Sequence, residues 1–160
     1  HGRRNKNAAC TDGGQNMITI RELLPEETAQ LAQLEAQNHP SPWSEAHFKA
    51  ACTSPNDTIW LLQVHQEWAA WMVWQHVCGE IELHLVTTAA EHRRQGLAGR
   101  LLQALEKTAC TLNAQRILLE VRASNTAAQQ LYRKHGFVQI ATRKNYYGGT
   151  EDAWIMEKLC

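Results

Sequence analysis

The chain has 160 residues, 44% hydrophobic and 20% charged, which gives enough length and apolar content for one domain with a buried core. Its 16 basic and 16 acidic residues cancel to a formal net charge of zero, which argues against a nucleic-acid-binding protein, since such proteins usually have a strong basic excess. No apolar run approaches the roughly 18 residues of a transmembrane helix, so no contact with a membrane is expected.

The 5 cysteines are widely spaced without a C-x-x-C pair, and the 8 histidines form no H-E-x-x-H motif. This spacing predicts reduced, mostly buried thiols in a cytoplasmic protein, with no disulfide framework and no metal site. Residues 1–16 are polar and lack a hydrophobic stretch, so we expect a disordered leader or expression remnant there. A single domain over residues 17–160 should follow.

The domain opens with a predicted strand over 17–23, in which isoleucines alternate with polar residues. Pro25 and the two acids after it start a helix that should run to Asn38. A second, short helix follows the N-cap residue Ser44. The residues expected to face the core from these two helices are Leu31, Ala32, Leu34, Ala46, Phe48 and Ala51.

The remaining elements predict an α/β fold with a mixed central sheet of about six to seven strands and helices on both faces. In chain order they are strands 58–65, 68–77 and 81–88, a helix from Leu97, strand 116–122, a helix from Asn125 that Gly136 terminates, and strands 137–143 and 153–159. The helix from Leu97 carries an apolar stripe at Leu97, Leu101, Leu102, Leu105, Ala109 and Leu112.

The segment 93–99 joins a predicted strand to a helix and has the features of an anion site. The first N–H groups of a helix have no intrahelical partners, and the helix dipole adds roughly half a positive charge there. Two arginines strengthen this field, and Gly96 lets the backbone approach a phosphate. If the strand before this turn and strand 116–122 are parallel neighbours, the turn and segment 120–125 should border one cleft.

Two motifs resemble signatures of the GCN5-related N-acetyltransferase (GNAT) superfamily. Residues 93–99, RRQGLAG, resemble its Q/R-x-x-G-x-G/A pyrophosphate loop, and residues 131–137, LYRKHGF, resemble its L-Y-x-x-x-G-F segment. The segment 87–90, TTAA, departs from the Val-x-Pro usual in that superfamily. Four further blocks resemble the bacterial ribosomal-protein-alanine N-acetyltransferases, the RimI-type family: PWSE at 42–45, LEVRASN at 119–125, NYY at 145–147 and EDA at 151–153.

The resemblance implies a GNAT acyltransferase fold that binds acetyl-coenzyme A as a cosubstrate, with the pyrophosphate on the loop amides and the pantetheine along the strand end. It also implies that loops 42–43 and 146–147 flank the acceptor peptide, with Glu151 and Asp152 near it. The cofactor-binding residues that it implies are Val86, Thr87, Thr88, Arg94, Gln95, Gly96, Leu97, Ala98, Gly99 and Asn125.

The same resemblance implies two catalytic residues. Glu120 would take a proton from the acceptor amine, through a water, and Tyr132 would protonate the departing thiolate. These roles suit the chemistry, because a peptide α-amine with a pKa near 7.7–8.0 is largely protonated at neutral pH and needs a base. A phenol with a pKa of about 10 is reasonably matched to a thiol.

Structural roles are open for the same residues. Glu120 can be a solvated strand residue paired with Arg122 or Arg100, Tyr132 can be a core residue, and Asn125 can cap a helix. The tryptophans expected in the core on the sheet face are Trp60, Trp68, Trp71 and Trp74.

A covalent route through a cysteine is the mechanistic alternative. Cys110 is expected on the buried face of its helix and Cys78 in a turn. Neither has an activating neighbour in the sequence, so direct transfer is favoured.

Three functions follow from these patterns. The first is acetyl transfer to an N-terminal alanine, which the RimI-type resemblance implies is that of small-subunit ribosomal protein eighteen. The second is the same chemistry on a lysine, a polyamine or another small-molecule amine. The third is a non-catalytic module that senses acetyl-coenzyme A, against which the retention of both Glu120 and Tyr132 argues. The expected partner is a ribosomal protein N-terminus, with no direct nucleic-acid contact, and the expected state is a monomer or weak dimer.

Overall fold

The computed structural model describes residues 8–12 and 16–160, which form two compact units. Of the described residues, the first unit contains those up to Trp74 together with Leu85–Leu101, and the second contains Gln75–His84 and Leu102–Cys160. Strands β4 and β5 and helix α3 contribute residues to both units.

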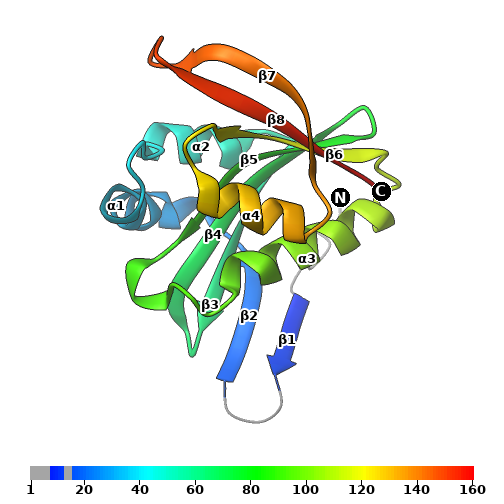
Figure 1. The fold of residues 1–160 in the computed structure, drawn as a ribbon. Helices are drawn as coiled ribbons and strands as arrows, with labels where there is room; N and C mark the ends of the chain where they lie inside the picture. The colour runs from blue at the N-terminus through cyan, green and yellow to red at the C-terminus, as the bar shows by residue number, and fades with distance from the viewer. Residues whose placement is uncertain (1–7, 13–15) are drawn as a thin grey trace. The chain divides into compact units, whose positions relative to one another are not determined.

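Apart from the first strand and the second 3₁₀ helix, which were not predicted, the helices and strands follow the predicted order, with changes at their ends (Figure 1). They are β1 (Ala8–Asp12), β2 (Asn16–Glu22), the 3₁₀ helix η1 (Pro25–Glu27), α1 (Thr28–Asn38), α2 (Glu45–Thr53), β3 (Asp57–Val64), β4 (Glu67–Val77), β5 (Glu80–Thr88), the 3₁₀ helix η2 (Ala90–His92), α3 (Leu97–Thr111), β6 (Arg116–Arg122), α4 (Thr126–Lys134), β7 (Val138–Tyr147) and β8 (Glu151–Leu159).

The predicted mixed sheet is confirmed, with eight strands where we expected about six to seven. The additional strand, β1, pairs antiparallel with β2 and lies within the segment 1–16 that we expected to be a leader. Residues 1–7 and 13–15 of that segment lie outside the described part of the chain. The single domain over 17–160 stays a prediction.

The first unit has the strand order β1-β2-β3-β4-β5 and a core in which α1 and α2 take part. Phe48 and Ala51 of α2 are buried, as predicted, but Ala46 is exposed because it lies in the first turn on the other side of the helix. Trp68 is only half-buried, which corrects the expectation of a fully buried set of tryptophans. The buried members of the core cluster are Leu23, Leu31, Phe48, Ala51, Ile59, Leu61, Trp71, Val73, Leu85 and Ala89.

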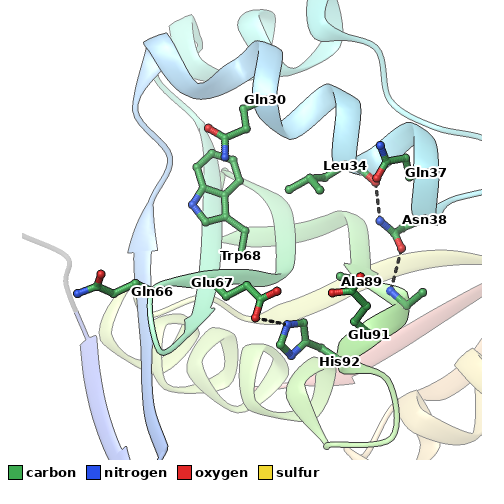
Figure 2. Close-up of a pocket in the computed structure, with 11 residues that line it drawn as sticks. Gln30, Leu34, Gln37, Asn38, Gln66, Glu67, Trp68, Ala89, Glu91 and His92 are labelled. Carbon is green, nitrogen blue, oxygen red and sulfur yellow. Dashed lines mark hydrogen bonds and ion pairs between the residues drawn. The ribbon is translucent and has the colours of Figure 1, made fainter.

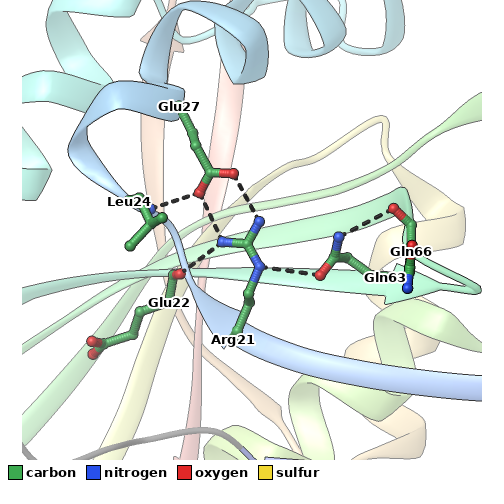
Figure 3. Close-up of polar contacts among 6 residues, drawn as sticks. All are labelled: Arg21, Glu22, Leu24, Glu27, Gln63 and Gln66. Carbon is green, nitrogen blue, oxygen red and sulfur yellow. Dashed lines mark hydrogen bonds and ion pairs between the residues drawn. The ribbon is translucent and has the colours of Figure 1, made fainter.

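A polar cluster fixes the entry of the chain into α1 (Figure 3). Both terminal nitrogens of Arg21 bind the carboxylate of Glu27, at 2.7 and 2.8 Å, and the Arg21 Nε donates to Gln63 on β3. Glu27 also accepts from the backbone N–H of Leu24. The hydrogen bonds from Arg21 hold the pKa of Glu27 below its ordinary value. Arg21 therefore ties β2 to the start of the helix through its ion pair with Glu27, and to β3 through its hydrogen bond to Gln63.

The second unit has the strand order β5-β6-β8-β7. β5 and β6 are parallel neighbours, as the predicted strand–helix–strand layout requires, with Leu83 opposite Leu119. β8 pairs antiparallel with both β6 and β7, and in Figure 1 β7 and β8 form a long twisted hairpin, drawn in orange and red. Helix α4 begins after its N-cap Asn125, and Gly136 follows its end with a φ of +88°.

Two expectations about buried side chains in this unit are wrong. Leu112 lies beyond the last residue of α3 and is 36% exposed. Cys110 is exposed, although Ala109 before it in α3 is buried, and Cys78 is exposed in a turn. Cys160 is exposed as well, so most of the cysteines whose side chains are described lie at the surface, where we had expected buried thiols. Within the described ranges, no helix is both long and apolar enough to span a membrane.

Candidate active site

The predicted phosphate loop lies in the first unit, between η2 and α3. Arg94 and Gly96 both have left-handed backbone conformations, with φ values of +63° and +71°. Such a conformation is strained for arginine, and strained residues cluster at ligand-binding sites. The loop residues 93–96 are exposed, whereas Leu97 is buried and anchors the first turn of α3. An exposed, arginine-bearing turn at a helix N-terminus fits an anion such as a diphosphate.

The end of β5 presents its side chains alternately to two faces. Thr87 is buried, and its hydroxyl donates to Oε1 of Glu35 at 2.7 Å, whereas Val86 and Thr88 are half-buried on the opposite face. The Thr87 side chain is therefore committed to the protein interior. If this residue also contacts a cofactor, as we predict, its backbone atoms are the available groups.

The last turn of α1 holds the segment that leads into the phosphate loop. Asn38 donates through Nδ2 to the carbonyl of Leu34, and its Oδ1 accepts from the backbone N–H of Ala90 at 2.8 Å (Figure 2). The carbonyl of Asn38 accepts from the side chain of Arg93. Asn38, whose side chain is held by a hydrogen bond within α1, thus fixes the position of η2.

A cleft of about 540 Å³ lies beside these contacts in the first unit (Figure 2). Across it, His92 Nε2 faces Glu67 Oε2 at 3.3 Å, and Glu91 brings a third possible ligand atom within 4.8 Å of both. The His92–Glu67 contact is an ion pair only when the imidazole is protonated, and both glutamates are exposed, as surface acids commonly are without a bound ion. None of the predicted cofactor-binding residues is among the lining residues, which are Gln30, Leu34, Gln37, Asn38, Gln66, Glu67, Trp68, Ala89, Ala90, Glu91 and His92.

Glu120, the predicted base, lies on β6 in the second unit. Its Oε1 accepts from Arg143 Nη1 on β7 at 2.7 Å, a partner that the sequence did not indicate. This hydrogen bond raises the pKa of Arg143, whose guanidinium also lies 4.5 Å from the ring centre of Tyr146. The side chain of Glu120 is 33% exposed, so it is accessible to a substrate.

Glu151 and Asp152 hold the loops around this carboxylate. Glu151 accepts from Ser124, through both backbone N–H and hydroxyl, and from Arg122 at 2.9 Å. The hydrogen bond from the Ser124 hydroxyl, followed by that from Arg122, lowers the pKa of Glu151. Asp152 accepts from the backbone N–H of Asn145, which has a left-handed φ of +54°. In this structure the two acids therefore position the segment before α4 and the tip of the β7–β8 hairpin.

Helix α4 positions the predicted acid, Tyr132. Asn125 caps the helix, because its Oδ1 accepts from the N–H of Ala128, and the buried amide of Gln129 donates to the carbonyls of Arg122 and Ala123 at the end of β6. The cap confirms one of the two roles considered for Asn125. A cofactor contact from the same residue stays a prediction.

The pKa of the Tyr132 phenol differs from that of a thiol by more than we expected. Burial, followed by the charge of Tyr147, raises the pKa of Tyr132 to about 12. Burial and the charge of Glu120 in turn raise the pKa of Tyr147. Tyr147 therefore interacts electrostatically with Tyr132 on one side and with Glu120 on the other.

The predicted site residues thus divide between the units. Glu120, Asn125 and Tyr132 lie in the second unit, and the loop and strand-end residues lie in the first. That they border one cleft stays a prediction. Sequence reasoning missed several polar residues with clear contacts, Glu35 and Arg143 among them. Glu35 had a signal, since it follows the core residue Leu31 by one helical turn, and Arg143 had none beyond its charge.

Comparison with known proteins identifies the chain's relatives. A model of the acetyltransferase (GNAT) family matches residues 28–137. The [ribosomal protein bS18]-alanine N-acetyltransferase of Escherichia coli K12 is 34% identical over 143 residues, covering 88% of this chain and 96% of that protein. An N-alpha-acetyltransferase of Sulfurisphaera tokodaii is 31% identical over 154 residues, covering 94% of this chain and 89% of that protein.

Solved structures agree with the sequence relatives. The crystal structure of the E. coli ribosomal-protein-S18-alanine N-acetyltransferase superposes with a TM-score of 0.83 at 34% identity, over 89% of this chain and 94% of that one. Arabidopsis thaliana NAA60 in complex with acetyl-CoA has a TM-score of 0.79 at 16% identity, over 89% of this chain and 98% of that one, which shows a shared fold.

Proposed function

The chain belongs to the GNAT acetyltransferase family, and we propose that it transfers the acetyl group of acetyl-coenzyme A to the α-amine of a protein N-terminus. The N-terminal alanine of ribosomal protein bS18 is the first candidate acceptor. The observation that carries this assignment is the 34% identity, over 88% of the chain, to the E. coli enzyme named for that reaction. Such an enzyme would act in the cytoplasm on a protein substrate, without direct contact with nucleic acid.

The loop between η2 and α3 suits the diphosphate of acetyl-coenzyme A. Its left-handed residues Arg94 and Gly96 turn the backbone into the helix, and the first turn of α3 offers N–H groups without intrahelical partners. Bound there, acetyl-coenzyme A would supply the activated acetyl thioester. Val86 and Thr88, half-buried on the face of β5 opposite to Thr87, are the side chains available to its pantetheine arm.

Glu120 and Tyr132 are the proposed base and acid. Glu120 would accept the proton that the acceptor ammonium loses, through a water, so that the neutral nitrogen forms a bond to the thioester carbonyl carbon. As the carbon–sulfur bond breaks, Tyr132 would donate a hydrogen bond to the departing sulfur. With a pKa of about 12, the phenol is neutral at physiological pH.

The acidity of Tyr132 bears on the timing of proton transfer. A thiol has a pKa near 8.5, so full transfer from Tyr132 to a thiolate is uphill by about 3.5 pKa units, or about 5 kcal/mol. Hydrogen bonding to the sulfur while the bond breaks is therefore favoured over complete proton transfer. The thiolate can then take its proton from solvent, and the acylated nitrogen loses its remaining extra proton to solvent, which leaves a neutral amide.

The assay for this proposal measures coenzyme A release with a peptide that carries the alanine N-terminus of bS18. Its control is the same peptide with a blocked N-terminus and intact lysines. We expect turnover with the free peptide alone. Equal turnover with both peptides would instead assign a lysine acetyltransferase, and no turnover despite acetyl-coenzyme A binding would favour a small-molecule acceptor or a sensor.

Two substitutions test the assigned roles in the same assay. Tyr132→Phe should retain acetyl-coenzyme A affinity and lower kcat at least about tenfold, since one hydrogen bond to developing charge is lost. Glu120→Gln should flatten the rise of rate with pH. Unchanged turnover in the first variant would remove Tyr132 as the acid, and an unaltered profile in the second would count against Glu120 as the base.

A further inference from the structure

Glu35 is a charged residue with no exposed surface, in the last turn and a half of α1. Its carboxylate accepts three hydrogen bonds. Oε1 receives the indole N–H of Trp71 at 2.9 Å and the hydroxyl of Thr87 at 2.7 Å, and Oε2 receives the backbone N–H of Trp43 at 3.0 Å. A buried carboxylate requires such donors, because removal from water without them is costly.

The three donors come from separate parts of the first unit. Trp43 belongs to the loop between α1 and α2, where it packs against Phe48 with ring centres 5.4 Å apart. Trp71 belongs to the middle of β4, and Thr87 to the end of β5. Oε2 of Glu35 thus binds the α1–α2 loop, and Oε1 binds strands β4 and β5.

We propose that Glu35 is a positioning residue that couples the α1–α2 loop, on the acceptor side, to the end of β5, on the acetyl-coenzyme A side. This inference rests on the proposed function, and on the expectation from the family resemblance that residues 42–43 of the α1–α2 loop flank the acceptor peptide. It adds that binding of acetyl-coenzyme A changes the affinity for the acceptor, and binding of the acceptor the affinity for acetyl-coenzyme A, through the carboxylate of Glu35.

The coupling follows from the burial of the group. When Oε1 of Glu35 shifts to follow the Thr87 hydroxyl, Oε2 moves relative to the N–H of Trp43, because the carboxylate is planar and rigid. No exposed surface offers water as a replacement partner for Glu35. A change at one donor is therefore transmitted to the other, and the two substrates bias one packed element.

Steady-state kinetics of three variants test the coupling. Thr87→Val removes the hydroxyl donor with little change of shape, and Glu35→Gln leaves one oxygen where the structure uses two. Each should raise the KM for the acceptor peptide about tenfold, the effect of roughly 1.4 kcal/mol, although neither side chain is on the acceptor loop. The double variant should raise this KM no further than Glu35→Gln alone, because both substitutions break the same connection.

Two controls separate coupling from general damage. Glu26→Gln removes an exposed carboxylate from η1 and should leave both KM values within about twofold, since an exposed charge contributes little. Thr87→Ser restores the hydroxyl and should recover most of the acceptor KM lost in Thr87→Val. Additive effects in the double variant, or an acceptor KM unchanged in folded Thr87→Val and Glu35→Gln proteins, would overturn the coupling.

Amide hydrogen exchange gives a readout that needs no turnover. The backbone N–H of Trp43 is bound to Glu35, so its exchange should accelerate at least about tenfold in Thr87→Val and in Glu35→Gln, but not in Glu26→Gln. If Trp43 exchanges faster in the variants but the wild-type protein does not acetylate the alanine peptide, the proposed function is wrong and the connection through Glu35 stands. Unchanged Trp43 exchange in both variants would remove the connection itself.

Discussion

At Glu120 the ion pair with Arg143 places a cation 2.7 Å from the group that should take a proton from the substrate. An acceptor ammonium and this guanidinium are both cations that hydrogen-bond to carboxylate oxygens, so they compete for the same group. Arg143 is 51% exposed and can move away, and its stacking on Tyr146 gives it a second partner. If Glu120 acts as the proposed base, this pair sets how strongly the site attracts an amine.

Replacement of Arg143 by Gln should lower the KM for the acceptor peptide about threefold at low ionic strength, because a competing cation is removed from the carboxylate. The difference should shrink as salt is added. Steady-state kinetics at two salt concentrations measure both effects. Lys144→Gln, which removes the same charge from the next residue along β7, is the matched control and should change KM less. A higher KM in Arg143→Gln would show that the guanidinium helps to bind the acceptor.

Among the connecting elements, two glycines perform different tasks with the same backbone conformation. Gly96 in the phosphate loop has a φ of +71°, and a methyl group added there would meet nothing within 4 Å. Gly136, which ends α4, has a φ of +88°, and a methyl group there would meet the side chain of Lys158 at 3.5 Å. In neither place is space the obstacle, so the cost of an alanine comes from the left-handed conformation.

Gly136→Ala should therefore lower the free energy of unfolding by about 1 kcal/mol and leave the Kd for acetyl-coenzyme A within about twofold. Gly96→Ala should raise that Kd at least about tenfold, because alanine favours a backbone conformation that turns the loop amides away. Denaturant unfolding and titration calorimetry of both variants measure the two effects. Equal loss of affinity in both would mean that Gly96 acts through stability alone.

At the scale of the whole molecule, the raised pKa of Tyr132 links stability to alkaline pH. The folded protein keeps the phenol neutral up to about pH 12, whereas an unfolded chain loses the proton near pH 10. The unfolded state therefore binds fewer protons between these values, and stability falls as pH rises through that interval. Below pH 10 the contribution is fully present.

From this linkage we expect the wild-type protein to lose about 1.4 kcal/mol of unfolding free energy at Tyr132 between pH 9 and pH 11. Tyr132→Phe should lack this part of the loss, whereas Tyr146→Phe, at an exposed tyrosine, should lose as much stability as the wild type. Denaturant unfolding at the two pH values measures the differences, and tyrosinate absorbance follows the ionisation directly. The same loss in Tyr132→Phe as in the wild type would place the alkaline sensitivity elsewhere.

Local signals in the sequence were sufficient for most of the elements. Strand β6 has the predicted bounds, Ser44 and Asn125 cap their helices as expected, and β5 and β6 are parallel neighbours. These features depend on alternation, helical spacing and caps, which act over a few residues. The family followed from short motifs, because a loop that binds phosphate needs its residues close together in the chain.

Only the tertiary structure decided which distant groups meet. The pairing of β1 with β2 gave an edge strand to a polar segment that has no core-facing pattern. The partner of Glu120 came from β7, 23 residues away, and the donors to Glu35 came from as far as 52 residues. The pKa of Tyr132 depends on burial and on Tyr147, neither of which local spacing reveals. Hydrogen bonds and desolvation depend on distance in space, so the sequence alone determined the fold and family of this protein, and packing decided the electrostatics of its site.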